Sequence, residues 1–436
     1  MAACSLQRCG TPQWFISAFS SGELVAIGPI VIVGGGTAGS TVALHLASRT
    51  ARPIVVCEPG ALSPHDEHTG FFDVIADDAL VSHRTVALTS QTSAQYVQAS
   101  ALGGGSAVNA MLLTGEEPDH VRGLTRLAQP DDMGQVARAL LASGGRPARL
   151  WWNRGRWNPG RALHHLVEEG RVDLRRHPVT RLHHTDGVIS AVACGDEVIE
   201  TDCVVLTAGA IASPALLLSS GLADVSPHIG HGLQDHPCIT FSLQLKKLEP
   251  SRFDATVVRE FDLSSGEKGL VVAYERASKH EPHLGLVSVL LMNPVSRGQV
   301  ALDGERIEVE LNLLNDARDV DVMRDLVRIT AFQLLSDEFE EISDSIAGDS
   351  WGTSIDQIFD MSDSELDAWI QASLVPVSHV SSSMHAAVDS VGRVAGTSGL
   401  VVADASVLAH VPHQTPAAPV TMEALRIARE LGERLQ

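Results

Sequence analysis

The sequence has few cysteines, no long apolar run and no cysteine spacing typical of a metal site. Its six cysteines form no C-x-x-C pair and no Cys/His ligand pattern. This usage favours free thiols in a reducing compartment over a disulfide framework. No window reaches the roughly 18 apolar residues that a bilayer-spanning helix needs. We therefore expect a cytoplasmic protein with no metal site and no membrane span.

Positive charge is also scarce. The chain has 32 Lys and Arg residues against 53 Asp and Glu residues, which gives a formal net charge of −21. Nucleic acids and anionic lipid surfaces are bound through clustered positive charge. Neither is therefore expected as a partner, and the sequence indicates no oligomeric state.

What the chain does have is enough apolar material for a large core. Hydrophobic residues make up 44% of its 436 residues, close to the globular average of about 45–50%. The length exceeds the about 100–200 residues of a typical domain, which predicts one large α/β domain or two interleaved ones. Residues 1–27 hold a single basic residue and only a short apolar patch. They do not resemble a signal peptide, and we expect an N-terminal extension.

The strongest local pattern is a β-turn-α-β unit near the start of the chain. A buried-strand run at residues 30–33 leads into glycines, a helical pattern at residues 41–47 and a second strand at residues 54–57. The turn has the form G-x-G-x-x-G at residues 34–39, in the strand-to-helix context of a dinucleotide-binding fold. We predict that this unit binds the phosphates of a dinucleotide at the N-terminus of its helix.

Each glycine of this turn has its own expected role. Gly34 permits the tight turn, Gly36 lets the backbone approach a pyrophosphate, and Gly39 lets the helix lie close to the strand. Glu58 follows the second strand, 19 residues after Gly39, where its carboxylate can accept hydrogen bonds from ribose hydroxyls. A carboxylate at this position disfavours a 2′-phosphate, which predicts FAD or NAD rather than NADP.

Further signature segments follow along the chain. They are a second glycine-rich loop at residues 102–111, a strand-to-helix segment at 207–218, G-x-x-L-x-D-H-P at 230–237, P-x-S-R-G from 294, and a strand ending in an acidic residue at 400–406. In this order they resemble the signature regions of the glucose–methanol–choline (GMC) oxidoreductases, a family of FAD flavoproteins. The resemblance touches most of residues 30–436 and favours FAD over NAD.

The resemblance implies an α/β fold in two parts. An FAD-binding Rossmann-like domain is expected from residues 28–120, 171–237 and 385–436. A substrate-binding domain, a mainly antiparallel β-sheet covered by helices, is expected from residues 238–384. Residues 121–170 would form a shortened lid or linker. Local patterns agree, with strand-like runs at 239–245, 286–291 and 307–313 and helical patterns at 319–343, 362–374 and 421–435.

The resemblance also implies which residues hold FAD. Both glycine-rich loops, the ends of neighbouring strands and the start of the last helix would line the cofactor. The expected residues are Gly34, Gly36, Thr37, Ala38, Gly39, Glu58, Gly103, Gly104, Ser106, Asn109, Ala110, Val179, Ala208, Gly209, Asp404, Ala405, Pro416 and Ala417. The histidine that links flavin covalently in some relatives would fall just before Asn109. This chain has Val108 there, so non-covalent FAD is expected.

The catalytic residues are implied by position as well. Members of the family oxidise an alcohol by hydride transfer to flavin N5, with a histidine base that opens H-x-x-G-T-x-x-M. The matching segment here runs from His379 to Met384, is shorter and lacks the Gly-Thr pair. The second catalytic position, a His or Asn in relatives, falls at Thr415, preceded by His413 and Gln414. We expect His379 to be the base and Thr415 or these neighbours to orient the hydroxyl, with His413 as the competing base.

Two residues of the D-H-P segment are interpreted as structural. The chain has 19 histidines, and a given histidine is more often a surface or structural residue than a catalytic one. His236 is expected to hold a loop or a contact between domains. Asp235 is expected to cap a turn rather than to titrate during catalysis.

The resemblance predicts oxidation of a small-molecule alcohol, with oxygen or another acceptor taking the electrons from the flavin. Three alternatives remain open. One is a non-redox FAD lyase of the same fold, of the hydroxynitrile-lyase kind. Another is a pseudo-enzyme that binds FAD and a partner, which the shortened His379 segment suggests. The third is an NAD-dependent dehydrogenase, which the second glycine loop and the Asp404 motif disfavour.

Overall fold

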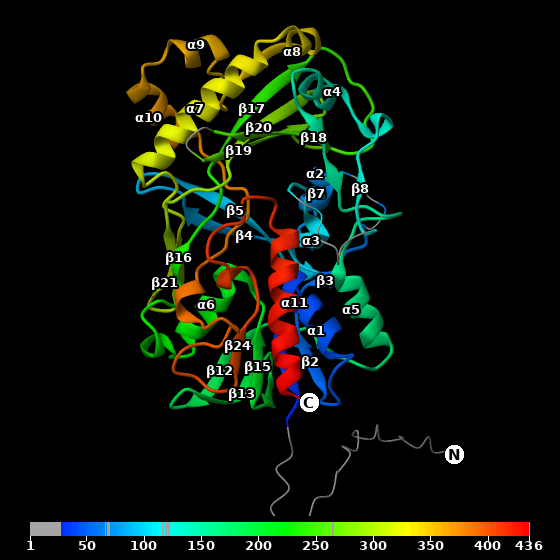
Figure 1. Cartoon of the computed structure of the whole chain (residues 1–436), viewed down its shortest axis with the longest axis vertical. Helices are drawn as coiled ribbons and strands as arrows, with labels where there is room; N and C mark the ends of the chain where they lie inside the picture. Colours follow the sequence, from blue (N-terminus) through cyan, green and yellow to red (C-terminus); the bar gives the residue numbers. More distant parts are fainter. Residues whose placement is uncertain are drawn as a thin grey trace, which may run out of the picture.

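The computed structural model has two halves that are stacked along its long axis (Figure 1). It describes residues 28–435 except 66, 68, 69, 116, 118–122, 264 and 265, so the expected extension at residues 1–27 lies outside the described part. The lower half in Figure 1 contains a parallel sheet, and the upper half contains an antiparallel sheet with helices above it. The predicted α/β fold class is confirmed.

A five-stranded parallel sheet forms the centre of the lower half, in the order β11-β2-β1-β15-β24. Its central strands are continuous runs of buried aliphatic residues, as strands covered on both faces must be. The order brings together the beginning, the middle and the end of the chain. The strands are β1 (Ile30–Val33), β2 (Ile54–Cys57), β11 (Asp173–Arg175), β15 (Cys203–Leu206) and β24 (Leu400–Val402).

Helices pack against this sheet. Helix α1 (Thr37–Leu46) contacts both α5 (Pro159–Glu168) and α11 (Ala417–Arg434), and the three lie side by side in Figure 1. Helix α6 (Gly209–Ser219) follows β15 directly. Smaller elements complete this half: α3 (Gly105–Val108), the parallel pair β3 (Ala61–Leu62) and β6 (Ala101–Leu102), and the antiparallel sheet β12 (Val179–Thr185), β13 (Val188–Cys194) and β14 (Glu197–Glu200). Helix α2 (Phe71–Ile75) lies in the upper half of Figure 1, where Phe71 and Phe72 contact Tyr274.

The upper half is built on a six-stranded antiparallel sheet in the order β23-β17-β20-β19-β18-β9. Helices cover one of its faces, since Gly269 of β19 lies directly against Leu326 of α7. The strands are β9 (Arg146–Pro147), β17 (Cys238–Leu245), β18 (Ala255–Asp262), β19 (Lys268–Tyr274), β20 (Leu284–Leu291) and β23 (Ser343–Ala347). The helices are α4 (Gln135–Ala142), α7 (Ala317–Leu334), α8 (Asp337–Ile342), α9 (Ile355–Asp360) and α10 (Asp363–Ser373).

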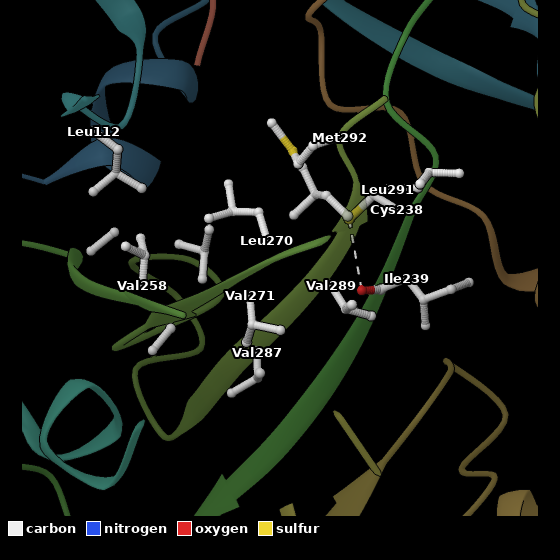
Figure 2. Close-up of a cluster of buried hydrophobic side chains, with 14 of the residues drawn as sticks. Leu112, Cys238, Ile239, Val258, Leu270, Val271, Val287, Val289, Leu291 and Met292 are labelled. Carbon is white, nitrogen blue, oxygen red and sulfur yellow. Dashed lines mark hydrogen bonds between the residues drawn. The ribbon is translucent and has the colours of Figure 1, made fainter. Parts of the chain in front are cut away.

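The other face of this sheet carries a row of apolar side chains. Cys238 pairs with Leu290, and Leu290 pairs with Leu270, so these three side chains share a face because paired residues point the same way. In Figure 2, Leu112 lies on the same side of the sheet as Leu270, and Val271 lies on the other side. Leu112 belongs to β7, close to the second glycine-rich loop. The apolar row is therefore the face that looks toward the lower half.

Four strand pairings cross the domain division that the sequence suggests: β4 with β22, β16 with β21, β9 with β18, and β7 with β10. Strands β4 and β5, from the expected FAD-binding part, join a sheet with β22 in the order β16-β21-β22-β4-β5, and β9 of the expected lid joins β18. The domain boundaries therefore remain an interpretation. The remaining strands are β4 (Val81–Ala87), β5 (Ser93–Ala99), β7 (Leu112–Leu113), β8 (Arg126–Leu127), β10 (Arg149–Leu150), β16 (His231–Leu233), β21 (Gly298–Asp303) and β22 (Arg306–Glu310). Among the described residues, no helix has the length and apolar character to cross a bilayer.

Candidate functional site

Two glycine-rich turns are bonded to each other at the C-terminal edge of the parallel sheet. The first follows β1, and the second precedes α3. The N–H of Gly103 donates to the carbonyl of Gly35 at 2.8 Å, and the hydroxyl of Thr37 donates to the carbonyl of Gly103 at 3.0 Å. Thr37 and Ser106 also share a hydrogen bond between their hydroxyls at 2.8 Å. The two loops therefore form a single unit.

The glycines of this unit fall into two kinds. Gly34 has a φ of 100°, and a Cβ on Gly39 would overlap the carbonyl oxygen of Gly34, so the fold itself requires glycine at both positions. A Cβ on Gly36 would meet only Gly104, with its Cα 3.7 Å away, and a Cβ on Gly105 would meet nothing within 4 Å. Open space therefore lies beside Gly36 and Gly105.

This space fits the phosphates of a dinucleotide. Helix α1 begins at Thr37 after Gly36, and no side chain caps its first turn. The first N–H groups of a helix have no partner within the helix, and together with the helix dipole they favour an anion. The bare backbone of Gly36 and the uncapped turn are the arrangement that a pyrophosphate needs.

Glu58 is positioned by the same turn. Its carboxylate accepts hydrogen bonds from the N–H of Gly35 at 2.8 Å and of Gly60 at 2.7 Å. Burial raises the pKa of Glu58, and the two backbone N–H groups act in the opposite direction. An ionised carboxylate has about four acceptor sites, so the two backbone bonds leave capacity for a ribose hydroxyl.

Asp404 has a structural role at the start of α6. Its carboxylate accepts hydrogen bonds from the N–H of Gly209 at 2.8 Å and the hydroxyl of Ser213 at 2.6 Å, and from the N–H of Ser406 at 2.8 Å. The residue is only 2% exposed, so a contact with FAD at Asp404 or Ala405 would have to come from the backbone. Among the other expected residues, Ala208 is the N-cap of α6 and Val179 begins β12.

The last helix begins four residues earlier than the 421–435 pattern predicts. Helix α11 starts at Ala417, with Pro416 as its N-cap and no side-chain cap on its first turn. Proline is compatible with a helix start because its missing N–H would have no partner there. The helix end at Ala417 and Ala418 is therefore a second uncapped, electropositive end near the expected cofactor site.

Arg156 contacts Asn109, one of the expected cofactor residues, and was not singled out by the sequence. It is 4% exposed and donates to the backbone carbonyl of Asn109, while Asn109 in turn accepts the N–H of Met111 at 3.0 Å. The Nε and Nη2 atoms of Arg156 have no hydrogen-bond partner in the described part of the chain. Burial lowers its pKa to about 10. A buried guanidinium with two unused donors beside Asn109 fits a site that receives an electron-rich group.

His379 is held by the D-H-P segment. Its Nδ1 lies 3.0 Å from Nδ1 of His236, and Nε2 of His236 lies 3.0 Å from the carbonyl oxygen of Pro412. The two rings are nearly perpendicular, at 86°, with centroids 5.2 Å apart. Nε2 of His379 has no hydrogen-bond partner among the described residues. His236 therefore bridges the segment of the expected base and the segment that leads into α11.

Asp235 fixes the backbone beneath this pair. One oxygen, Oδ1, accepts the N–H of His236 at 2.9 Å and the N–H of His379 at 3.0 Å. Burial raises the pKa of Asp235 to about 7, partly offset by these N–H donors. Burial also lowers the pKa of His379 to about 4 and that of His236 well below its usual value. Both imidazoles are therefore neutral at physiological pH.

The residues expected to orient the substrate hydroxyl differ in their remaining hydrogen-bonding capacity. The Thr415 hydroxyl donates to the carbonyl of Leu112 at 2.8 Å and accepts the N–H of Thr114 at 3.2 Å, so its only proton is in use. The amide oxygen of Gln414 is buried without a partner among the described residues. His413 is exposed and stacks on His410, with ring centroids 4.6 Å apart.

Gln234 joins the segments that meet here. Its amide nitrogen donates to the carbonyl of Pro294 at 2.7 Å, and its amide oxygen accepts the N–H of Val411 at 3.0 Å. Its backbone forms a reciprocal pair with Ser381, at 3.0 Å in each direction. This buried glutamine therefore connects the P-x-S-R-G segment, the segment of His379 and the approach to α11.

The D-H-P segment also raises the question of a metal. The ligand atoms of Asp235, His236 and His379 all lie within 4.8 Å of one another. Oδ1 of Asp235 already accepts two backbone N–H groups, and Nε2 of His236 is bonded to a backbone carbonyl. We interpret this cluster as a hydrogen-bonded network.

Comparison with known proteins decides the family. Two models of the GMC oxidoreductase family match residues 161–238 and residues 294–424. The chain belongs to the GMC oxidoreductases. The family that the sequence motifs indicate is therefore confirmed. The predicted FAD cofactor is confirmed with it, because GMC oxidoreductases bind FAD.

Several oxidases are similar to this chain in sequence or in fold. The 5-(hydroxymethyl)furfural oxidase of Methylovorus sp. (strain MP688) is 24% identical over 526 aligned positions, which cover 91% of this chain and 97% of that one. Among solved structures, pyridoxine 4-oxidase from Mesorbium loti superposes with a TM-score of 0.79 at 20% identity, over 93% of this chain and 99% of that one. Formate oxidase of Aspergillus oryzae RIB40 superposes with a TM-score of 0.76 at 16% identity, over 94% of this chain and 100% of that one. At these identities the structural matches show the fold alone.

Proposed function

We propose that this GMC oxidoreductase oxidises the CH–OH group of a small alcohol, with His379 as the general base. The observation that carries the proposal is the state of the His379 ring. One nitrogen is hydrogen-bonded to His236 and the other has no partner among the described residues. A neutral imidazole with an unoccupied nitrogen is suited to accept a hydroxyl proton.

The low pKa of His379 keeps its imidazole unprotonated. Burial lowers it to about 4, so the ring is in its proton-accepting form throughout the physiological range. When bound, FAD supplies the acceptor for the hydride that leaves the substrate carbon. The hydroxyl proton passes to Nε2 of His379, and the alcohol carbon becomes a carbonyl.

We assign the orientation of the hydroxyl to Gln414 rather than to Thr415. The Thr415 proton is bonded to Leu112, so this side chain cannot donate to a substrate oxygen. The amide of Gln414 contains a buried polar atom without a partner among the described residues. An amide has both an NH2 donor and a carbonyl acceptor, so Gln414 is able to hydrogen-bond a substrate hydroxyl.

The apolar face of the upper sheet favours an apolar or aromatic alcohol as the substrate. Cys238, Leu270 and Leu290 form a buried apolar row on the face toward the lower half. A hydrogen-bonded pair, Thr240 and Ser288 at 2.8 Å, is the neighbouring polar feature on that face. Two relatives, named for 5-(hydroxymethyl)furfural and for pyridoxine, suggest primary alcohols on an aromatic ring as first substrates to test.

The test is anaerobic stopped-flow mixing of the FAD-loaded protein with aromatic, aliphatic, sugar and sterol alcohols, including 5-(hydroxymethyl)furfural and pyridoxine. We expect bleaching of the flavin by at least one of them. His379→Ala should slow this step by about 10²–10⁴-fold, the usual contribution of a general base. His413→Ala is the matched control and should reduce at nearly the wild-type rate.

Other outcomes would contradict the proposal. A flavin that no alcohol bleaches would favour the lyase or the pseudo-enzyme. A wild-type rate in His379→Ala, together with a slow His413→Ala, would transfer the base to His413. Comparison of oxygen with a quinone during reoxidation then separates an oxidase from a dehydrogenase.

A further inference from the structure

We propose that His236 is a positioning residue that sets the tautomer of His379 and leaves Nε2 of His379 as the proton-accepting atom. The inference concerns a contact inside the chain, between two residues 143 positions apart. Its catalytic consequence rests on the proposed function, but the tautomer itself can be measured without any turnover.

The backbone carbonyl of Pro412 decides which nitrogen of His236 carries the proton. A carbonyl oxygen can only accept a hydrogen bond, so Nε2 of His236, 3.0 Å away, must carry the proton. A neutral imidazole has a single N–H, which leaves Nδ1 of His236 as an acceptor. Nδ1 of His379 lies 3.0 Å from that acceptor and must therefore be the donor. By the same rule, Nε2 of His379 has a lone pair.

His236 is a neutral imidazole. Its side chain is completely buried, and burial holds its pKa well below the usual value, with the His379 ring acting in the same direction. The other titratable groups around it are Asp235, His413 and the Tyr96 hydroxyl beside Asp235. Oδ1 of Asp235 bonds to backbone N–H groups rather than to either ring. The backbone carbonyls of Pro412 and Met292 favour a protonated ring, but burial and the neighbouring His379 ring outweigh them, so His236 is neutral.

The arrangement also helps the base to work. When Nε2 of His379 accepts a proton, positive charge spreads over the ring and strengthens the hydrogen bond from its Nδ1–H to His236. The same bond holds the ring in one orientation. Without it, His379 could rotate or populate the other tautomer, in which Nε2 already carries a proton and cannot act as a base.

Two substitutions of His236 separate its hydrogen bond to His379 from its hydrogen bond to Pro412. Asparagine places its amide near the position of the histidine Nδ1, so His236→Asn can still offer an oxygen to Nδ1–H of His379. Glutamine places its amide nearer to Nε2, so His236→Gln can still donate to Pro412 but presents no acceptor at the former Nδ1 position. Both variants remove the imidazole, which makes each a control for the other.

The first measurement is long-range ¹H–¹⁵N correlation spectroscopy of protein labelled with ¹⁵N-histidine, with His379 assigned by its loss in His379→Ala. The wild-type protein should show His379 protonated at Nδ1 and unprotonated at Nε2. The same pattern should persist in His236→Asn. In His236→Gln we expect a mixture of tautomers or the Nε2–H form.

The second measurement is the rate of anaerobic flavin reduction by the alcohol that bleaches the wild-type protein fastest. Loss of the hydrogen-bond partner that orients a metal-bound histidine typically costs about 10–100-fold, and we expect a loss of similar size in the flavin reduction rate of His236→Gln. His236→Asn should recover most of it. FAD content and thermal unfolding should match between the two variants, which separates positioning of the base from a general loss of structure.

Several results would overturn the inference. A wild-type His379 that carries its proton on Nε2 would do so, as would an unchanged tautomer in His236→Gln. A stoichiometric metal that shifts both histidine signals on chelation would replace the hydrogen bond with coordination. The expected tautomers combined with an inactive wild-type protein would instead leave the inference standing and refute the proposed function.

Discussion

The proposed cofactor cradle and the proposed catalytic end of this molecule are built in different ways. The cradle consists of backbone, with glycines at residues 34–39 and 103–105 placing bare chain beside an uncapped helix start. The catalytic end consists of side chains, in which His236, His379 and Gln234 connect segments that are far apart in sequence. A backbone site depends on local conformation, whereas a side-chain network depends on the complete fold.

The two regions should therefore respond differently to a single substitution. In the cradle, an added side chain either breaks the fold or blocks the ligand, depending on the glycine. At the catalytic end, a lost side chain should leave the fold and the cofactor in place and change only the rate.

The largest effects are expected in the cradle. Gly36→Val places a side chain in open space that only Gly104 approaches, so the protein should fold but bind no FAD. Gly39→Ala places a Cβ on the carbonyl oxygen of Gly34, so it should destabilise the protein even without cofactor. Thermal unfolding of the FAD-free proteins and flavin absorbance after reconstitution measure the two effects separately. A Gly36→Val protein that is yellow after purification would mean that the phosphates lie elsewhere.

This contrast also explains how much could be predicted from sequence. The turn after β1 could be predicted because each glycine acts through its own φ or its own missing Cβ, within a few residues of its neighbours. The role of Asp404 was less accessible. Its motif marks the correct place, but its carboxylate is used by Gly209, Ser213 and Ser406, a set that only the fold assembles.

The role of His236 could not be predicted for the same reason. The D-H-P segment indicated a structural histidine, and the structure does show that it joins two segments through Pro412 and His379. Nothing in the local pattern connects residue 236 with residue 379, because their contact depends on the pairing between Gln234 and Ser381. The Asp-His-Pro pattern next to a predicted strand indicates that this segment is important. It does not indicate that His379 is the partner of His236.

An intermediate effect is expected at the start of the last helix. Gln414→Leu should lower the rate of flavin reduction about tenfold, equivalent to about 1.4 kcal/mol and within the usual range for one hydrogen bond, with FAD binding unchanged. Thr415→Val is the matched comparison. It removes the bonds to Leu112 and Thr114 and should lower the free energy of unfolding by about 1–3 kcal/mol by leaving a backbone group unpaired. A rate loss confined to Thr415→Val would return the orienting role to that residue.

The smallest expected effect is that of pH on the rate of flavin reduction. A base must be unprotonated to act, and an exposed histidine with a pKa near 6.5 would lose half of its activity at that pH. Burial lowers the pKa of His379 to about 4, so the rate constant for flavin reduction should be constant from pH 5 to pH 9 and fall only near pH 4. Stopped-flow reduction across this range gives the profile.

The buried carboxyl of Asp235, with a pKa of about 7, is a neighbour of His379 that titrates inside that range. Its Oδ1 accepts the N–H groups of His236 and His379, while Oδ2 has no partner among the described residues. A proton on Oδ2 leaves the Oδ1 bonds in place, so no step is expected. Asp235→Asn keeps an acceptor and cannot titrate, which makes it the control. An acid limb near pH 6.5 that survives in Asp235→Asn would belong to His379 itself, and would mean that its ring is far better solvated than the contacts with His236 and the sheet imply.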